Sequence, residues 1–194
     1  MKFAFLFSAT LLIGVQCAAE PLAADVATIE YEEISVKILA PWEGKGEVHQ
    51  IGPDTLMFLG TYEGIMYIET GDVEQPLDAA IFTCPATAEI RQFDDHVDVN
   101  GHCAMTSSTG DLAFARFNCK GGSEACSGRF VLTGGTGALE GITGESDLVV
   151  RTALSSMVED AEAGTLTSST EGLAVWPELR VRVPVKQQAT DAAD

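Results

Sequence analysis

The side chains that could carry out acid–base, metal or nucleophilic chemistry are few in this sequence and widely spaced. There are three histidines, His49, His96 and His102. The spacing between His96 and His102 is not that of a known zinc or metalloprotease motif. The sequence has no G-x-S-x-G nucleophile elbow, and nothing in it points to a Ser-His-Asp triad. We therefore predict no metal site and no cofactor.

Glu63 is the one charged residue in the apolar run Thr55–Ile68, TLMFLGTYEGIMYI. A carboxyl group buried in such surroundings has a raised pKa and can serve as a general acid or base. The commoner alternative is that Glu63 takes an outward-facing or turn position. Glu63 is thus the catalytic candidate of the sequence. Because both alternatives fit it, the sequence leaves open whether the protein is an enzyme.

Four cysteines lie beyond the N-terminal segment, an even number that predicts disulfides in an exported protein. Three pairings are possible. We favour Cys84–Cys103 and Cys119–Cys126, because each would join nearby strands. Zinc is the alternative, but the paired C-x₂-C spacing of zinc sites is missing.

Glycine dominates the segment Gly134–Gly144, which follows an apolar strand-like stretch. A phosphate-binding loop would need Lys followed by Ser or Thr, and the sequence Thr143-Gly144-Glu145 supplies neither. Glu140 stands where the third glycine of a G-x-G-x-x-G motif would be. We interpret the segment as a structural turn, since glycine reaches positive φ without steric cost.

The sequence from Thr133 to Gly144, TGGTGALEGITG, resembles the GGTGxFxGxxG turn of allene oxide cyclase and dirigent-like barrels. It resembles in particular the secreted bacterial proteins called allene oxide cyclase barrel-like, with Leu139 where an aromatic residue is usual. The resemblance implies a calycin-like antiparallel barrel of eight strands and supplies no activity. The Glu and Asn that are catalytic in that family match no position here, and Glu63 is only a candidate.

The residues that would face the lumen can be chosen from the alternation of side chains along a strand. Within Thr55–Ile68, one face carries large apolar residues separated by glycines, a pattern that fits the inside of a barrel. The residues of this face are Leu56, Phe58, Gly60, Tyr62, Gly64, Met66 and Ile68. We predict that Phe58, Tyr62 and Met66 line the lumen and contact a ligand.

The rest of the chain reads as about ten short strands, which predicts an all-β fold, with a small antiparallel barrel of about eight strands preferred over a β-sandwich. Local signals set the expected boundaries. They are a bulge between Tyr31 and Ile34, a loop over residues 41–54, a strand end at Pro85, a hairpin turn at Asn100-Gly101 and a break between Trp176 and Leu179.

Residues 1–19 have the charge and apolar run of a secretory signal peptide, with a second possible cut after residue 24. We expect a single domain over residues 25–185, a disordered acidic tail over 186–194 and a periplasmic or extracellular location. The net charge of −18 argues against binding to nucleic acid. No further stretch is long and apolar enough to span a membrane.

Two functions fit these features. One is a binding or structural module whose apolar lumen holds a small hydrophobic ligand. The alternative, implied by the resemblance, is a cyclase or isomerase that confines a small hydrophobic substrate. A buried carboxylate in an open apolar cavity would favour the enzyme, whereas a filled core would favour a structural protein. The oligomeric state stays open.

Overall fold

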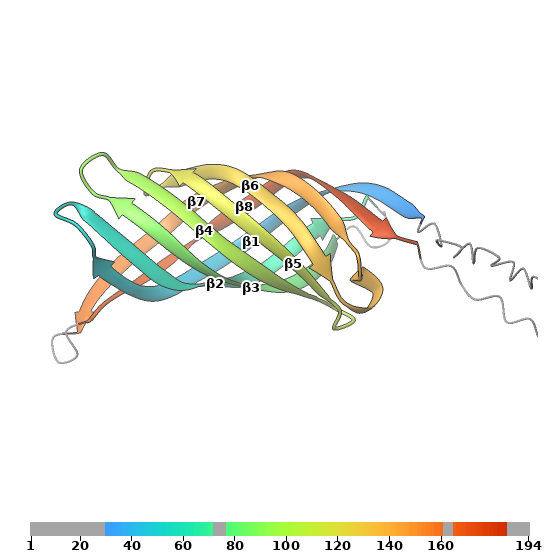
Figure 1. The fold of residues 1–194 in the computed structure, drawn as a ribbon, viewed down its shortest axis with the longest axis horizontal. Helices are drawn as coiled ribbons and strands as arrows, with labels where there is room; N and C mark the ends of the chain where they lie inside the picture. The colour runs from blue at the N-terminus through green and yellow to red at the C-terminus, as the bar shows by residue number, and fades with distance from the viewer. Residues whose placement is uncertain (1–29, 72–76, 161–164, 186–194) are drawn as a thin grey trace, which may run out of the picture.

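The computed structural model of the protein describes residues 30–71, 77–160 and 165–185, and these form one closed antiparallel β-barrel (Figure 1). The predicted barrel is confirmed, whereas the signal peptide and the C-terminal tail lie outside the described residues. The strands are β1 (Tyr31–Gln50), β2 (Thr55–Glu69), β3 (Leu77–Arg91), β4 (His96–Ser107), β5 (Leu112–Gly121), β6 (Ala125–Gly135), β7 (Thr143–Asp160) and β8 (Thr165–Pro184).

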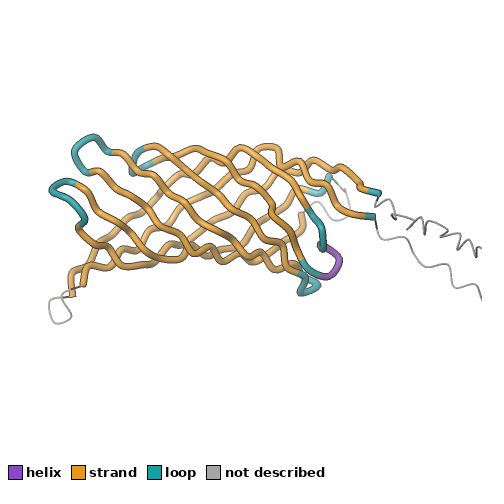
Figure 2. The backbone as a smooth tube through the Cα atoms, viewed as in Figure 1, coloured by secondary structure: helices purple, strands orange, loops and turns teal. Residues whose placement is uncertain are grey.

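Each strand pairs with the next in sequence, and β1 pairs with β8 to close the barrel (Figure 2). The strands alternate between a buried apolar inner face and an exposed outer face, as expected for a sheet with one buried side. The outer face carries apolar side chains as well as polar ones, for example Ile65 and Ile81. In β3, for example, Phe82, Cys84, Ala86 and Ala88 are buried and the residues between them are exposed. No helix in the described ranges is long and apolar enough to cross a membrane.

Glycines on the inner face make room for aromatic rings. A Cβ atom on Gly44 would lie 2.6 Å from two ring carbons of Tyr62, its register partner in β2. Five aromatic side chains are seated against glycines in this way, and the pairs are Gly44 with Tyr62, Gly46 and Gly60 with Phe58, Gly64 with Phe82, Gly101 with Phe117, and Gly172 with Trp42. The alternation of small and large residues in the sequence is therefore a packing pattern of the lumen.

Pro85 does not end a strand, contrary to the prediction, because β3 continues through it to Arg91. β3 stays paired with β2 at Pro85, opposite Thr61, while its pairing with β4 is interrupted between Thr83 and Ala86. Proline lacks an N–H group, so it removes bonds to one neighbouring strand and leaves the other ladder intact. Pro41 behaves in the same way, and the predicted loop over residues 41–54 is strand as far as Gln50.

The predicted hairpin at Asn100-Gly101 is also wrong, because both residues lie inside β4. Neither has the positive φ of a primed turn. Gly101 is needed for space instead, since a Cβ atom there would lie 2.5 Å from a ring carbon of Phe117.

The predicted break between Trp176 and Leu179 is a β-bulge within a continuous β8. Ile38 pairs with Trp176 and Val36 pairs with Leu179, so two residues of β8 face one residue of β1. The bulge predicted between Tyr31 and Ile34 is wrong, because the pairing of β1 with β8 is continuous there and the register shift lies between Val36 and Ile38.

The glycine-rich segment connects β6 to β7 at one end of the barrel. It runs from the end of β6 through the short 3-10 helix η1 (Gly137–Leu139) into β7, with positive φ values of 58° at Gly137 and 80° at Gly141. The hydroxyl of Thr136 accepts a hydrogen bond of 3.0 Å from the backbone amide of Leu112. The backbone amide of Thr136 donates a hydrogen bond of 2.8 Å to the carbonyl of Leu112. Ile142 is buried, so the predicted structural turn also fills the barrel end beneath it.

Candidate functional site

The barrel encloses a cavity of about 190 Å³, which lies on the side of the core away from the glycine-rich segment. It reaches the opposite rim, where Ile90 and Val97 stand at the ends of β3 and β4 and Gly122 and Ser123 form the turn between β5 and β6. β7 pairs with β6 only as far as Arg151 but with β8 as far as Asp160, so the β7–β8 hairpin extends past the end of β6 (Figure 1).

Aromatic side chains from β1 and β2 form one wall of the cavity. The Tyr62 and Trp42 rings meet edge to face with centroids 5.3 Å apart, and the Phe58 and Tyr62 ring centroids are 5.7 Å apart. Deeper in the barrel, the Phe130 and Trp176 rings also meet edge to face, at 5.2 Å. Each of these five side chains lines the cavity.

The part of the wall that comes from β3 to β6 is rich in sulfur. The predicted disulfides are both present: Cys84–Cys103 joins β3 to β4 with Cα atoms 4.1 Å apart, and Cys119–Cys126 joins β5 to β6 with Cα atoms 5.5 Å apart. All four cysteines and Met105 contribute to this part of the wall, and Met66 of β2 adds a sulfur atom beside the aromatic rings. Polarisable sulfur next to aromatic rings suits contact with a flat apolar molecule.

Polar groups in the wall are few and uncharged. No Asp, Glu, His, Lys or Arg of the described ranges lines the cavity. Burial alone raises the pKa of Tyr62 to about 12, and none of the hydrogen bonds in the described ranges involves its hydroxyl. The Nε1 groups of Trp42 and Trp176 are buried without an acceptor among these residues. Unpaired buried donors are unusual and costly, so these groups mark the cavity as a candidate site.

Phe58, Tyr62 and Met66, the lumen residues expected from alternation, all line the cavity. Glu63 does not, because it is exposed on the outer face of β2. There it lies opposite Glu43 of β1, and Glu43 in turn lies opposite Glu171 of β8. The cavity therefore contains no carboxylate from the described residues.

His96 and His102 are on the outward-facing positions of β4 and are separated by about 20 Å at the usual rise per residue of a strand. Within the described ranges, no group of His, Cys, Asp and Glu side chains could hold a metal ion.

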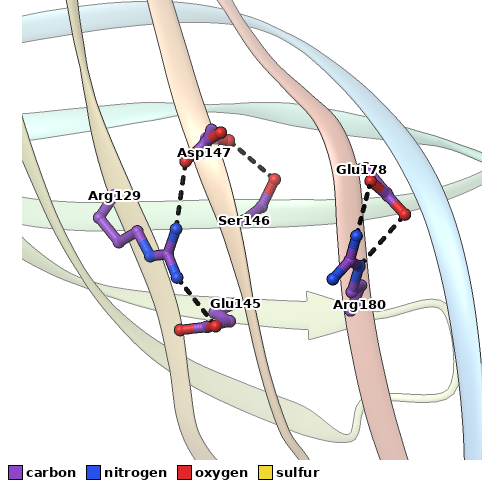
Figure 3. A network of polar contacts seen from close by, with 6 residues as sticks. All are labelled: Arg129, Glu145, Ser146, Asp147, Glu178 and Arg180. Atoms are coloured by element: carbon purple, nitrogen blue, oxygen red, sulfur yellow. Dashed lines mark hydrogen bonds and ion pairs between the residues drawn. The ribbon is translucent and has the colours of Figure 1, made fainter.

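The charged side chains pair with one another outside the barrel (Figure 3). Arg129 bridges Glu145 and Asp147 on β7 at 2.8 and 3.2 Å, and Arg180 pairs with Glu178 at 3.2 Å. Near the cavity rim, the Asp95 carboxylate accepts a hydrogen bond of 3.0 Å from the Ser123 amide, and this bond lowers the pKa of Asp95. Charge thus lies on the outside of the barrel, and the lumen is apolar.

The sequence reasoning did not single out several cavity residues, above all Trp42, Phe82 and Trp176. Trp42 and Trp176 come from β1 and β8, which meet only because the barrel closes. A signal was present nonetheless, since Gly172 and Gly64 provide the space that the Trp42 and Phe82 rings occupy.

Comparisons with known proteins add a structural likeness. No known family matches the sequence, and no curated protein matches it. Among solved structures, the chain is similar to a pterocarpan synthase dirigent protein, with 11% identity and a TM-score of 0.30 over 77% of this chain and 87% of that chain. The assignment of the fold rests on the strand pairings described above.

Proposed function

We propose that this protein is an exported binding module that holds a small apolar molecule in the lumen of its barrel. The observation that carries the proposal is the cavity, whose wall is mostly apolar and which reaches the rim. Uncharged hydroxyl side chains also line it, and these are Ser123, Thr152, Ser155, Ser168 and Thr170. Ligand pockets in proteins are concave and mostly apolar, with a small number of polar groups that orient the ligand. The aromatic wall, the sulfur-rich wall and the Tyr62 hydroxyl fit that description.

The geometry supports binding better than cyclisation. An acid–base mechanism needs a titratable group within reach of the reacting atoms. Glu63 faces outward, and the titratable side chain found in the cavity wall is Tyr62, whose raised pKa keeps it protonated at neutral pH. The proposal is therefore that the ligand leaves the protein chemically unchanged.

The two disulfides fit an oxidising compartment and, with the features of residues 1–19, support export. Mass spectrometry of the protein purified from the periplasm or the medium tests this part of the proposal. A chain that retains residues 1–19 and its free thiols in the producing cell would contradict it.

Binding can be measured with the intrinsic fluorescence of the protein. The two tryptophans of the sequence, Trp42 and Trp176, both line the cavity, so their emission reports on its contents. Titration with para-cymene, a neutral single-ring hydrocarbon, is expected to change this emission in a saturable way. Isothermal calorimetry on the same samples gives the stoichiometry, expected to be one molecule per barrel.

Ala88→Phe is the variant that should block binding. Ala88 is buried and lines the cavity, so a phenylalanine there would occupy the ligand's space. Thr87→Phe is the matched control, because Thr87 is the exposed neighbour on the same strand. If the folded Ala88→Phe protein binds para-cymene as well as Thr87→Phe does, the lumen is not the binding site. Ala88→Leu, a smaller change, serves if the phenylalanine variant does not fold.

A further inference from the structure

The size of the cavity limits the ligand. A cavity of about 150 Å³ in a protein core accommodates a benzene molecule. The cavity here, at about 190 Å³, has room for one ring with short substituents. A long alkyl chain would have to extend past the rim into water, where its apolar surface would gain nothing from the lumen.

The walls also limit the charge of the ligand. A carboxylate transferred from water into this cavity would lose its hydration, and the cationic side chains of the described residues are all outside the lining. Arg129, Arg180 and Arg182, for example, pair with acidic residues on the outer surface. The site therefore discriminates against anions through the absence of a compensating charge in its wall.

Several hydrogen-bond donors at the aromatic wall have no acceptor in the described residues. The Tyr62 ring is held between Trp42, Phe58 and Gly44, which fixes its position in the cavity wall. The indole N–H groups of Trp42 and Trp176 lie beside the same cavity and have no acceptor in the described ranges. Trp176 is only 5% exposed, so water outside the barrel does not satisfy its N–H group. The Tyr62 hydroxyl is also without a hydrogen-bond partner in the described ranges, and a ligand oxygen could accept its hydrogen.

We infer that the ligand is a neutral molecule of about one ring that carries a hydroxyl or carbonyl oxygen, and that the Tyr62 hydroxyl is the group that holds this oxygen. This inference rests on the proposed function, because it names the chemical class that the same lumen accepts. Protonated Tyr62 can donate its hydrogen to the ligand oxygen throughout the neutral pH range.

The test compares three molecules with one carbon skeleton: para-cymene, para-isopropylbenzyl alcohol and para-isopropylbenzoate. Each is titrated into the wild type, Tyr62→Phe and Tyr67→Phe by tryptophan fluorescence and calorimetry. Tyr67 lies on the same strand as Tyr62 but is exposed on the outside, so Tyr67→Phe is the matched control. Tyr62→Phe keeps the ring and removes only the hydroxyl.

We expect the alcohol to bind the wild type at least about 100-fold more tightly than the carboxylate, the penalty for an unpaired buried charge. Tyr62→Phe should weaken binding of the alcohol by about three- to tenfold, the effect of one neutral hydrogen bond, and leave para-cymene binding within about twofold. Tyr67→Phe should change neither. A fourth molecule, para-octylbenzyl alcohol, should bind more weakly than the short alcohol despite its larger apolar area.

The outcomes separate the two proposals. If para-cymene binds but the carboxylate binds as tightly as the alcohol, or Tyr62→Phe leaves the affinity for the alcohol unchanged, the inference is wrong and the proposed function stands. Tighter binding of para-octylbenzyl alcohol would overturn the size limit. If none of the molecules binds the folded wild type, the proposed function fails and the inference fails with it.

Discussion

At the end of the barrel where the glycine-rich segment joins β6 to β7, the lumen is filled by apolar side chains, of which Leu132, Ile142, Leu179 and Val181 are all buried. At the other end, the strands carry equally apolar residues, but the lumen contains a cavity. The same alternating pattern therefore produces packed core at one end and binding space at the other.

The difference follows from what enters the lumen. At the filled end, the glycine-rich segment folds back under the barrel, and Leu139 and Ile142 pack against the core. At the open end, the apolar side chains of the described turns, Ile51 and Phe93, are exposed, so no apolar side chain from a described turn enters the lumen there. Stability is concentrated at the end that carries the conspicuous motif, and the candidate site lies at the end without one.

The largest effect should come from the filled end. Leu179→Ala removes a side chain that is 4% exposed, and we expect the free energy of unfolding to fall by roughly 2–5 kcal/mol. Ile90→Ala, at the cavity rim, should cost less because Ile90 is only half-buried. Denaturant unfolding of both variants measures this comparison. Equal losses would show that the open end is packed as tightly as the filled one.

The strands around the cavity are cross-linked as well as packed, and this gives the second prediction. Loop-closure entropy predicts a loss of about 3 kcal/mol for removal of Cys84–Cys103, which are 19 residues apart, and about 2.5 kcal/mol for Cys119–Cys126, which are 7 residues apart. Double Cys→Ala variants test each bridge in denaturant. Because both bridges line the cavity, para-cymene binding should weaken too, whereas Leu179→Ala should leave it intact in the folded protein.

The third prediction uses pH to probe the open end. The pKa of Tyr62 is raised by burial from 10.0 to about 12. The unfolded chain therefore loses this proton first as pH rises, so the stability contributed by neutral Tyr62 is complete below pH of about 10 and declines between about 10 and 12. The full decline is up to about 2.7 kcal/mol, from the two-unit difference in pKa.

Tyr62→Phe removes this contribution, so its stability should decline less than that of the wild type over the alkaline range. Phenolate absorbance during titration provides the second measurement, since the difference between the two proteins isolates Tyr62. An ionisation of Tyr62 near its ordinary pKa would mean that water reaches the hydroxyl freely and that the aromatic wall is open.

These contrasts also explain which features the sequence could predict. Alternation is a property of neighbouring residues, so the lumen face of β2 with Phe58, Tyr62 and Met66 could be predicted from a single run of residues. The disulfides could be predicted because both bridges join strands adjacent in sequence. Turn signals failed at Pro85 and at Asn100-Gly101 because ladders on both sides of each strand override local preference in a closed sheet.

The candidate site could be predicted only in part, because its wall combines residues from β1 and β8, the first and last strands of the barrel. Trp42 and Trp176 lie far apart in the chain and are brought together by the pairing of β1 with β8. The size and shape of the cavity depend on which aromatic rings pack against glycines. No local pattern reports a space left empty between side chains.

The fourth prediction tests one of those glycines. Gly44→Ala would place a Cβ atom 2.6 Å from the Tyr62 ring and 2.8 Å from the Thr170 hydroxyl, so the ring must move into the cavity. We expect a loss of roughly 1–3 kcal/mol in the free energy of unfolding and weaker binding of para-cymene. Gly52→Ala is the control, since its Cβ atom would meet only Thr55, at 3.4 Å. Unchanged binding in Gly44→Ala would place the ligand away from Tyr62.

The smallest effect should be local and confined to the cavity rim. Asp95 has a positive φ of 46°, and its carboxylate holds the amide of Ser123, a residue that lines the cavity. The hydrogen bond lowers the pKa of Asp95, so the contact is present above the ordinary pKa of an aspartate and is lost as pH falls through the lowered value.

Asp95→Ala removes the acceptor, whereas Asp95→Asn keeps an uncharged oxygen in its place. We therefore expect the Ser123 amide to exchange its hydrogen fastest in Asp95→Ala and at an intermediate rate in Asp95→Asn, with little change in global unfolding, because Asp95 is on the surface. Thr136→Ala provides the counterpart at the filled end, where loss of the contact with Leu112 should also expose the packing of Ile142. If Asp95→Ala destabilised the whole barrel as much as Thr136→Ala did, the two ends would be equally important for folding, and their division into a stabilising end and a binding end would fail.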